Sequence, residues 1–269
     1  MTFERGSALP VTRTAKADIH YTLSGKADGP VFLWAHGWGQ NHKAFEPLAS
    51  SFFAMGRHIL VDLPGFGESP LPPDAWGTAD YADAMADVLR QHTDGPVIWI
   101  GHSFGCRVGI QLAARHPDLV KGVFLIAAAG LKRKRSFLSA LSLKLRIMLY
   151  KALKLLVPPA QPRERLLARF GSRDYAKADP KLRQILVKTV NEDLSEQARA
   201  VSCPAMLVYG AADTETPPEI GLRLQRLIPD AELLLLDGQD HYTVLGDGRY
   251  PVAAALKKFI EKVSAGHAG

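Results

Sequence analysis

Short apolar runs bounded by glycine and proline recur along the chain and alternate with helical patterns. Eight of these runs are predicted strands, at residues 12–14, 19–23, 31–35, 58–62, 97–101, 123–127, 205–210 and 232–236. Most of them lack the alternation of apolar and polar residues, as expected for strands that are buried on both faces of a mainly parallel sheet. The first two are predicted to pair antiparallel at the N-terminal edge of that sheet.

Helical patterns fill the intervals between the strands. Apolar residues recur at helical spacing in residues 78–92, 103–116, 217–227 and 250–263, and Thr78 is predicted to cap the first of these helices. Strands that alternate with helices favour a doubly wound α/β fold, in which one open sheet carries helices on both faces.

The alternation stops between residues 131 and 200, where no strand is expected and the pattern is helical. An apolar stripe with helical spacing is followed by three prolines and then by helical patterns at residues 163–170 and 180–194. We therefore expect a core domain formed by residues 1–130 and 201–269, and a helical cap formed by residues 131–200. This insertion is predicted to lie over the carboxyl edge of the sheet.

Basic residues are concentrated in the first part of the insertion. The chain has a net charge of +6, yet residues 131–157 hold eight Lys and Arg and no acid, and the remaining 25 Lys and Arg are outnumbered by 27 Asp and Glu. A packed cap with a solvated cationic face is the first interpretation. Weak contact with an anionic membrane surface, or with an acidic partner, is the alternative. Nucleic-acid binding is not expected, because the cations interleave with aliphatic and not with aromatic side chains.

The composition excludes several classes of protein. With 269 residues, of which 47% are hydrophobic and 22% charged, the chain is typical of a globular protein that folds without disulfides or metals. Cys106 and Cys203 are too few for a secreted disulfide scaffold. An acid and a proline among the first ten residues argue against a signal peptide, and no apolar run reaches the roughly 18 residues of a transmembrane helix. These features predict a cytoplasmic protein.

The sequence Gly-His-Ser-Phe-Gly at residues 101–105 follows a predicted strand and opens a predicted helix. This is the context of a nucleophile elbow, in which a sharp strand-to-helix turn presents a serine hydroxyl above the sheet. Glycines two residues before and after the serine remove side chains that would collide across the bend. Ser103 is therefore the candidate nucleophile, near a helix N-terminus that favours developing negative charge.

A serine hydroxyl needs a base to take its proton, and nine histidines compete for that role. Most of them lie in or beside predicted strands and helices, and His102 is expected to point away from its neighbour Ser103. His241 lies on a short loop after the last predicted strand. The chain order of serine, acid and histidine makes His241 the candidate base.

The acid that orients the base is expected between the serine and the histidine, at the carboxyl end of a strand. Asp213 follows the seventh predicted strand and is preferred, because the turn there keeps it nearest to the strand end. Glu215 is the main competitor. Asp237 and Asp240 adjoin His241 in sequence and are interpreted as turn formers.

Acyl transfer also requires N–H donors for the oxyanion. The backbone amide of Phe104 is one candidate, since this residue directly follows the nucleophile. The amide of Trp38 is the other, because its loop follows a strand and contains flanking glycines that allow close approach to a substrate. His36 in the same loop is interpreted as a hydrogen-bonded scaffold residue that does not titrate during catalysis.

With these motifs, the chain resembles the α/β-hydrolase fold superfamily, and in particular its serine esterases and lipases with a helical cap. The resemblance extends over essentially the whole chain. It rests on the loop at residues 36–38, the glycine-containing stretch at 62–69, the elbow, Asp213 and His241. It implies an eight-stranded, mainly parallel sheet and a triad of Ser103, His241 and Asp213.

The predicted activity is hydrolysis of small-molecule carboxylic esters with small to medium apolar groups, through an acyl-enzyme. The cap, with Trp38, Phe104 and Tyr242, is expected to line a largely apolar pocket. The same triad acting on a carbon–carbon bond, a thioester or an amide is the alternative. A basic cap that binds a membrane surface or an acidic partner is the non-enzymatic alternative.

No cofactor and no metal are expected, because the histidines lack metal-ligand spacing and no nucleotide-binding fingerprint is present. Cys106 stands where many members of the superfamily have a second glycine after the elbow. It is not interpreted as a second nucleophile.

Overall fold

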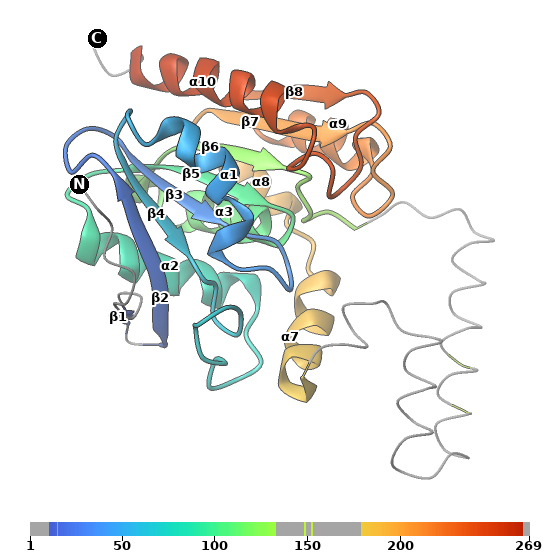
Figure 1. The fold of residues 1–269 in the computed structure, drawn as a ribbon. Helices are drawn as coiled ribbons and strands as arrows, with labels where there is room; N and C mark the ends of the chain where they lie inside the picture. Colours follow the sequence, from blue (N-terminus) through green and yellow to red (C-terminus); the bar gives the residue numbers. More distant parts are fainter. Residues whose placement is uncertain (1–10, 15, 133–147, 149–151, 153–178, 266–269) are drawn as a thin grey trace.

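The computed structural model describes residues 11–14, 16–132, 148, 152 and 179–265 (Figure 1). Most of the predicted cap, including its basic apolar stripe and the helical pattern at residues 163–170, lies outside the described residues.

Eight strands form one sheet in the order β1-β2-β4-β3-β5-β6-β7-β8. Their bounds are β1 Val11–Arg13, β2 Asp18–Gly25, β3 Val31–Ala35, β4 Arg57–Val61, β5 Val97–His102, β6 Val120–Ile126, β7 Ala205–Gly210 and β8 Ala231–Leu236. The β1–β2 and β2–β4 pairs are antiparallel, and all pairs from β4 to β8 are parallel. The predicted eight-stranded, mainly parallel sheet with an antiparallel pair at its N-terminal edge is confirmed.

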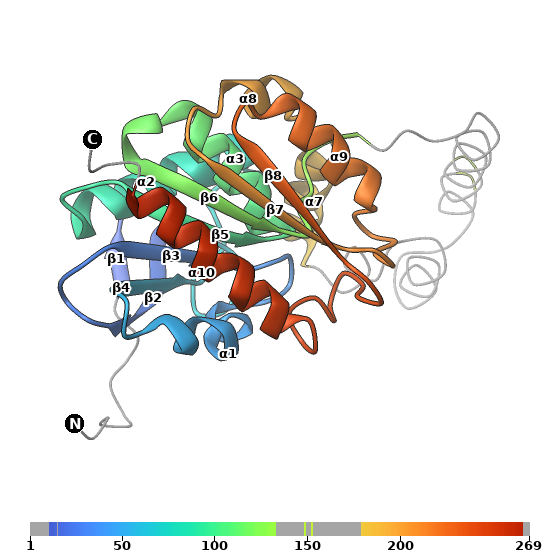
Figure 2. The same cartoon turned by 90° about the horizontal axis from the view of Figure 1, so that it is seen from above.

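Helices cover both faces of the sheet (Figure 2). One face carries α1 and α10, and the other carries α2, α3, α8 and α9. The bounds of the helices are α1 Glu46–Ala49, α2 Thr78–His92, α3 Phe104–Arg115, α7 Pro180–Asn191, α8 Ser195–Ala200, α9 Pro218–Leu227 and α10 Arg249–Ala265, with short 3-10 helices at His42–Ala44, Ser50–Phe52 and Pro117–Leu119. This arrangement is the doubly wound α/β fold that the sequence predicts.

Each central strand supplies side chains to two separate cores. In β3, Leu33 packs on the α2–α3 face and Trp34 on the α1–α10 face, and in β5 Trp99 and Ile100 divide in the same way. All four side chains are buried. Because both faces are covered, both sets of alternate residues have to be apolar, which explains the lack of alternation in the sequence.

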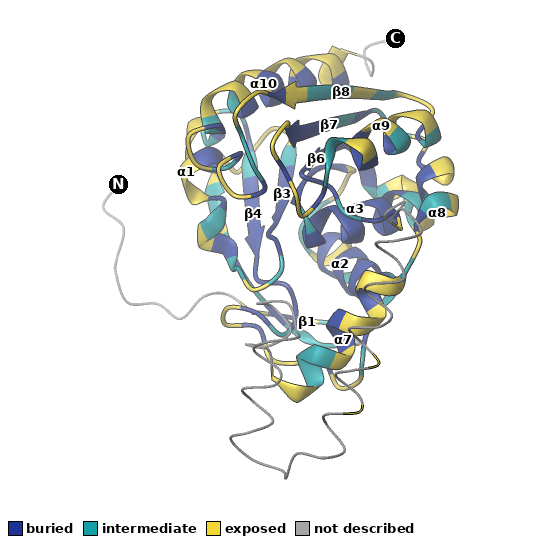
Figure 3. Cartoon of the chain, turned by 90° about the vertical axis from the view of Figure 1, so that its right-hand side faces the viewer, coloured by how far each residue is buried: buried dark blue, intermediate teal, exposed yellow. Residues whose placement is uncertain are grey.

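The last strand differs from the central ones because β8 lies at the edge of the sheet, where several of its residues are only partly covered (Figure 3). Leu235 is 42% exposed. The apolar run alone does not distinguish this edge strand from a buried one, since both are rich in leucine or isoleucine.

The N-terminus of α2 corrects one expectation. Thr78 is the first residue of the helix rather than its cap, and Gly77 precedes it in extended conformation. The Gly77 amide donates to Asp80 Oδ2 at 2.9 Å, and the Thr78 amide donates to Glu192 Oε1 at 3.1 Å. The predicted cap by Thr78 is therefore wrong. A carboxylate just beyond the end of α7 satisfies the free amide, and only the tertiary structure brings it there.

Two helices of the described chain fall within the predicted insertion. Helix α7 matches the expected helical pattern and begins with Pro180, with the Asp179 side chain accepting from the Lys181 amide at 2.8 Å. Helix α8 packs against α3, and its Ala198 is fully buried in the core on that face. Among the described helices, none combines the length and the apolar character needed to cross a lipid bilayer.

Candidate active site

The site lies at the carboxyl edge of the sheet, where β3 and β5 are neighbours although β4 intervenes in sequence. The chain turns towards opposite ends of the sheet after these two strands, so their loops diverge and leave a crevice. Trp38 follows β3 and Ser103 follows β5. Asp213 and His241 follow β7 and β8 at the same edge, because all these strands run parallel.

Ser103 occupies the sharp turn between β5 and α3. Its φ of 47° and ψ of −99° are strained for a residue with a side chain. The helix can start this close to the sheet because residue 105 is glycine, since a Cβ there would lie 2.0 Å from the carbonyl oxygen of Ala35. The Ser103 amide donates to the Ile126 carbonyl at 3.0 Å, which fixes the turn to β6. The elbow has the geometry that the sequence predicts.

The loops after β7 and β8 are held against each other below the triad. The amide of Ala212 donates to the Gln239 carbonyl at 2.9 Å, and a Cβ at Gly210 would lie 2.3 Å from that same oxygen. Glycine at the end of β7 therefore lets the two loops approach closely. This contact brings Asp213 within hydrogen-bond distance of His241 Nδ1.

A hydrogen-bonded chain joins the three predicted triad residues. Ser103 Oγ lies 3.0 Å from His241 Nε2, and His241 Nδ1 lies 2.8 Å from Asp213 Oδ2. Asp213 and His241 are buried, while Ser103 is partly open to the pocket. With Nδ1 donating to the carboxylate, Nε2 is free to accept the serine proton.

Asp213 is held as an anion. Burial alone would raise the pKa of this carboxyl, but hydrogen bonds and the charge of His241 outweigh that effect and leave its pKa below the usual value. Its Oδ1 accepts from the amides of Glu215 and Thr216, both at 2.8 Å. Of the two acids considered from sequence, Asp213 is the one that contacts the histidine. The Glu215 side chain is exposed and lines the pocket.

Thr216 is a member of this network that the sequence reasoning did not find. Its hydroxyl lies 2.8 Å from Asp213 Oδ2, 3.1 Å from His241 Nδ1 and 3.1 Å from the carbonyl oxygen of Ala127. The hydroxyl has one proton to donate, to the carboxylate or to the carbonyl, and it can accept from the imidazole. The sequence signal for this role is a hydroxyl residue three positions after the candidate acid.

Two further histidines hold the backbone around the site through hydrogen bonds. His36 Nδ1 lies 2.7 Å from the Gly37 carbonyl, and its Nε2 accepts from the Leu63 amide at 3.0 Å. Burial lowers the pKa of His36 to about 4, so it stays neutral and acts as the scaffold residue that the sequence predicts. His102 turns away from Ser103, and its Nε2 donates to the carbonyl of His241 at 3.0 Å.

The loop that contains Trp38 is hydrogen-bonded to the start of the helix that contains Phe104, so the two candidate oxyanion amides lie on adjoining segments. Gly105 donates to the His36 carbonyl at 3.1 Å and Gly37 donates to Gln40 Oε1 at 2.9 Å. The backbone amides of Trp38 and Phe104 have no acceptor among the described residues. Phe104 is the first residue of α3, where helix geometry leaves the N–H without a partner. Both amides are therefore available to a bound group.

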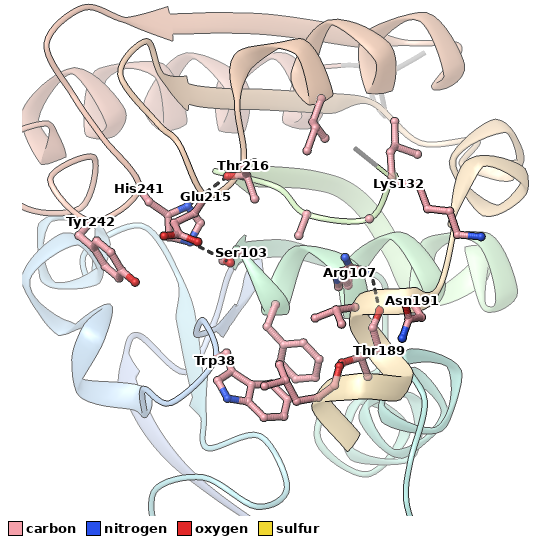
Figure 4. Close-up of a pocket in the computed structure, with 17 residues that line it drawn as sticks. Trp38, Ser103, Arg107, Lys132, Thr189, Asn191, Glu215, Thr216, His241 and Tyr242 are labelled. Atoms are coloured by element: carbon pink, nitrogen blue, oxygen red, sulfur yellow. Dashed lines mark hydrogen bonds between the residues drawn. The ribbon is translucent and has the colours of Figure 1, made fainter. Parts of the chain in front are cut away.

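A pocket of about 560 Å³ opens beside Ser103 (Figure 4). Trp38, Phe104 and Tyr242 line it, as the sequence predicts. Apolar and aromatic residues form most of the lining, as predicted, and charged and amide-bearing side chains also line it: Arg107, Lys132, Asn191 and Glu215. Arg107 is the notable omission from the sequence reasoning. Its signal was a charge four residues after the nucleophile, among the apolar residues that begin the helix.

Cys106 is fully buried, and its thiol donates to the Ile126 carbonyl at 3.3 Å. Burial raises the pKa of this thiol well above its usual value, which keeps it protonated at neutral pH. These surroundings agree with the expectation that Cys106 is not a second nucleophile. Among the described residues, no group of three His, Cys, Asp or Glu side chains is arranged to hold a metal ion.

Comparison with known proteins places the chain in a family. Residues 30–247 match the family model described as the alpha/beta hydrolase fold. The chain belongs to the α/β-hydrolase fold family. The predicted superfamily is thereby confirmed, and so is the prediction that the protein is a hydrolase.

This member of the α/β-hydrolase fold family has curated relatives with named activities. A pimeloyl-[acyl-carrier protein] methyl ester esterase of Chromobacterium violaceum is 31% identical over 220 residues, which cover 76% of this chain and 84% of the relative. A 2-(acetamidomethylene)succinate hydrolase of Mesorhizobium japonicum is 29% identical over 233 residues, which cover 81% and 83%. Among solved structures, the enol-lactonase from Burkholderia xenovorans LB400 has a TM-score of 0.71 at 18% identity, covering 92% of this chain and 98% of that one. That likeness concerns the fold.

Proposed function

We propose that this α/β-hydrolase cleaves small-molecule carboxylic esters through a triad of Ser103, His241 and Asp213. The observation that carries the proposal is the continuous hydrogen-bonded chain from Ser103 Oγ through His241 to Asp213, at 3.0 and 2.8 Å. The first distance is within the range in which a base takes a proton from a nucleophile, and the second lets the carboxylate orient that base. The methyl ester esterase among the relatives supports ester hydrolysis as the reaction.

Acylation begins when Ser103 Oγ attacks the ester carbonyl and its proton moves to His241 Nε2. The carbonyl oxygen becomes an oxyanion, for which the free amides of Trp38 and Phe104 are the proposed donors. His241 then gives the proton to the departing alcohol oxygen, leaving an acyl group on Ser103. Asp213 stabilises the imidazolium in both steps and keeps its own negative charge.

Deacylation repeats these steps with water. His241 takes a proton from water, the resulting hydroxide attacks the acyl carbonyl, and the proton returns to Ser103 Oγ as the acid leaves. A thioester or an amide would require the same groups. A panel of esters, thioesters and amides with the purified protein therefore assigns the bond type.

Ser103→Ala is the decisive variant. It removes the nucleophile, and we expect kcat/KM for p-nitrophenyl butyrate to fall by at least about 10³-fold, since a triad acts as a unit. Circular dichroism of the variant serves as the folding control. A fluorophosphonate probe should label the unaltered chain at Ser103, as read by peptide mass. Retention of more than a tenth of the activity in the alanine variant would overturn the proposal.

We also propose that residues 131–200 form a helical cap over a core of residues 1–130 and 201–269. Support comes from α7, whose residues Leu186, Thr189, Val190 and Asn191 line the pocket beside the nucleophile. Limited proteolysis that releases residues 131–200 as one fragment, with residues 1–130 and 201–269 still associated, would agree with this division.

A further inference from the structure

Arg107 has an unusual position for a charged side chain. It lies on α3, four residues after Ser103 and therefore about 6 Å further along the helix axis. The side chain is only 8% exposed, yet it lines the pocket. Its Nη1 donates to the carbonyl oxygen of Thr189 at 2.8 Å. No carboxylate of the described chain forms an ion pair with it.

With one carbonyl acceptor among the described residues, the guanidinium keeps N–H donors that are open to the pocket, because the group carries five such donors and a full positive charge. Burial lowers the pKa of Arg107, since the pocket wall removes water from the charge. Glu192 and Asp193 act on it electrostatically, but their oxygens accept hydrogen bonds from Thr78 and Ser195. Neither of these acids lines the pocket.

The pocket has two ends of different charge, on opposite sides of Ser103 (Figure 4). We call one the His241 end, which consists of His241, Glu215, Thr216 and Tyr242. We call the other the Arg107 end, which consists of Arg107, Lys132, Thr189 and Asn191. Among the described lining residues, the one acid is Glu215 at the His241 end, and both Lys and Arg side chains lie at the Arg107 end.

The chemistry of ester cleavage decides which part of a substrate lies at which end of the pocket. The leaving alcohol has to lie at the His241 end, because His241 Nε2 gives it a proton. The acyl group stays attached to Ser103 and extends to the opposite side, where Arg107 lies one turn along the same helix. A negative charge on the alcohol would face Glu215, whereas a negative charge on the acyl group would face a guanidinium.

We propose that Arg107 binds a carboxylate at the far end of the acyl group, so that the preferred substrates are half-esters of dicarboxylic acids. A carboxylate can accept two parallel N–H bonds from a guanidinium, which would satisfy donors that the described residues leave open. The inference rests on the proposed ester hydrolysis, and it names the substrate class of the same site.

Two substrates of nearly equal shape test the proposal. Monomethyl glutarate carries the carboxylate, and methyl 5-oxohexanoate carries a neutral methyl ketone in its place. We expect the unaltered enzyme to prefer the half-ester by about 10- to 100-fold in kcat/KM, the range for hydrogen bonds to a charged group. In Arg107→Met this ratio should fall towards one. The ratio comes from one preparation, so it does not depend on the folded fraction of the variant.

Two companion variants separate the specific contact from general charge. Arg107→Lys keeps a cation but loses the bidentate geometry, and it should recover only part of the preference. Arg115→Met removes a cation from the exposed end of the same helix, where Arg115 pairs with Asp83, and it should leave the ratio unchanged. A ratio that falls equally in the Arg107 and Arg115 variants would contradict a carboxylate contact at Arg107.

Direct binding distinguishes failure of this proposal from failure of the proposed function. Glutarate binding to the unaltered protein and to Arg107→Met is measured by calorimetry, with no reaction required. If the enzyme cleaves the neutral ester as well as the half-ester and glutarate does not bind, the carboxylate site is refuted and the esterase remains. If neither ester is cleaved but glutarate binds only where Arg107 is present, the carboxylate site stands and the proposed reaction is wrong.

Discussion

At the His241 end of the pocket the buried Asp213 carboxylate has hydrogen-bond donors for both of its oxygens, whereas at the Arg107 end the guanidinium has one acceptor among the described residues. Asp213 accepts hydrogen bonds from His241, from the Thr216 hydroxyl and from two backbone amides. The buried Arg107 guanidinium donates to a single carbonyl of the described chain. The first arrangement is complete before a substrate arrives, as electrostatic preorganisation requires. The second is completed by a ligand.

Substitutions at the two ends should therefore have different effects on activity. Changes in the triad and at Thr216 should lower the rate of every ester by the same factor, because they alter the chemistry itself. Changes at Arg107 should alter the ratio between charged and neutral substrates. The following predictions test that distinction at the His241 end, from the largest effect to the smallest.

Asp213→Asn should have the largest effect. The amide lacks the charge that stabilises the imidazolium and favours the wrong tautomer of His241, so kcat should fall by about 10³- to 10⁴-fold. Monomethyl glutarate and methyl 5-oxohexanoate should lose activity by the same factor. Glu215→Gln should lower kcat by less than about tenfold. Asp237→Asn, on the exposed loop before His241, is the matched control for the loss of a carboxylate near His241. A larger loss in Glu215→Gln than in Asp213→Asn would reverse the assignment of the acid.

We expect the folded state to lose stability in acid at two buried histidines beside the triad, His36 and His102. Burial lowers the pKa of His36 to about 4 and that of His102 to about 3, against 6.5 in an unfolded chain. Between pH 6.5 and 4 the unfolded state therefore binds protons that the folded state does not, so stability falls as the pH falls. At pH 5 the loss is about 2 kcal/mol for each histidine relative to pH 7.5.

Urea unfolding at pH 7.5 and 5 measures this loss. His58 provides an internal comparison on the opposite face of the sheet, since burial also lowers its pKa to about 4. His58 accepts from Trp34 and its Nε2 donates to the Phe52 carbonyl, roles that glutamine can keep. His58→Gln should reduce the pH dependence by about the contribution of one histidine. An unfolding free energy that is equal at the two pH values would contradict the buried neutral state of these side chains.

Thr216→Val should have the smallest effect of the three. It keeps the shape of the side chain but removes the hydroxyl between Asp213, His241 and Ala127, and we expect kcat to fall by about tenfold. Because Thr216 positions other groups, KM should stay within about twofold and Thr216→Ser should restore most of the rate. An effect confined to KM, or no rescue by serine, would indicate a packing role instead.

Much of this architecture follows from local sequence signals. The elbow was predictable because the sharp turn at Ser103 restricts the residues around it, and a Cβ at position 105 would collide with the backbone of β3. The central strands were predictable because cores on both faces demand uninterrupted apolar runs. The order of serine, acid and histidine along the chain indicated Asp213 and His241, and the structure brings these side chains together.

Other features depend on contacts between segments far apart in sequence. Glu192 satisfies the amide of Thr78 across 114 residues, and no pattern near Thr78 indicates this. The edge position of β8 follows from the strand order, not from its leucine-rich sequence. In the sequence Arg107 is a charge among the apolar residues of the first turns of α3, and only the tertiary structure covers it with α7 and lets the Thr189 carbonyl accept its hydrogen bond.

The sequence by itself determined the fold and the identity of the candidate triad, because a strained turn and buried strands each admit few residue types. The tertiary structure alone decided which charges are satisfied and which remain open to a ligand. A charge is satisfied only by groups within about 3 Å, and the chain brings such groups together from distant segments only when it folds.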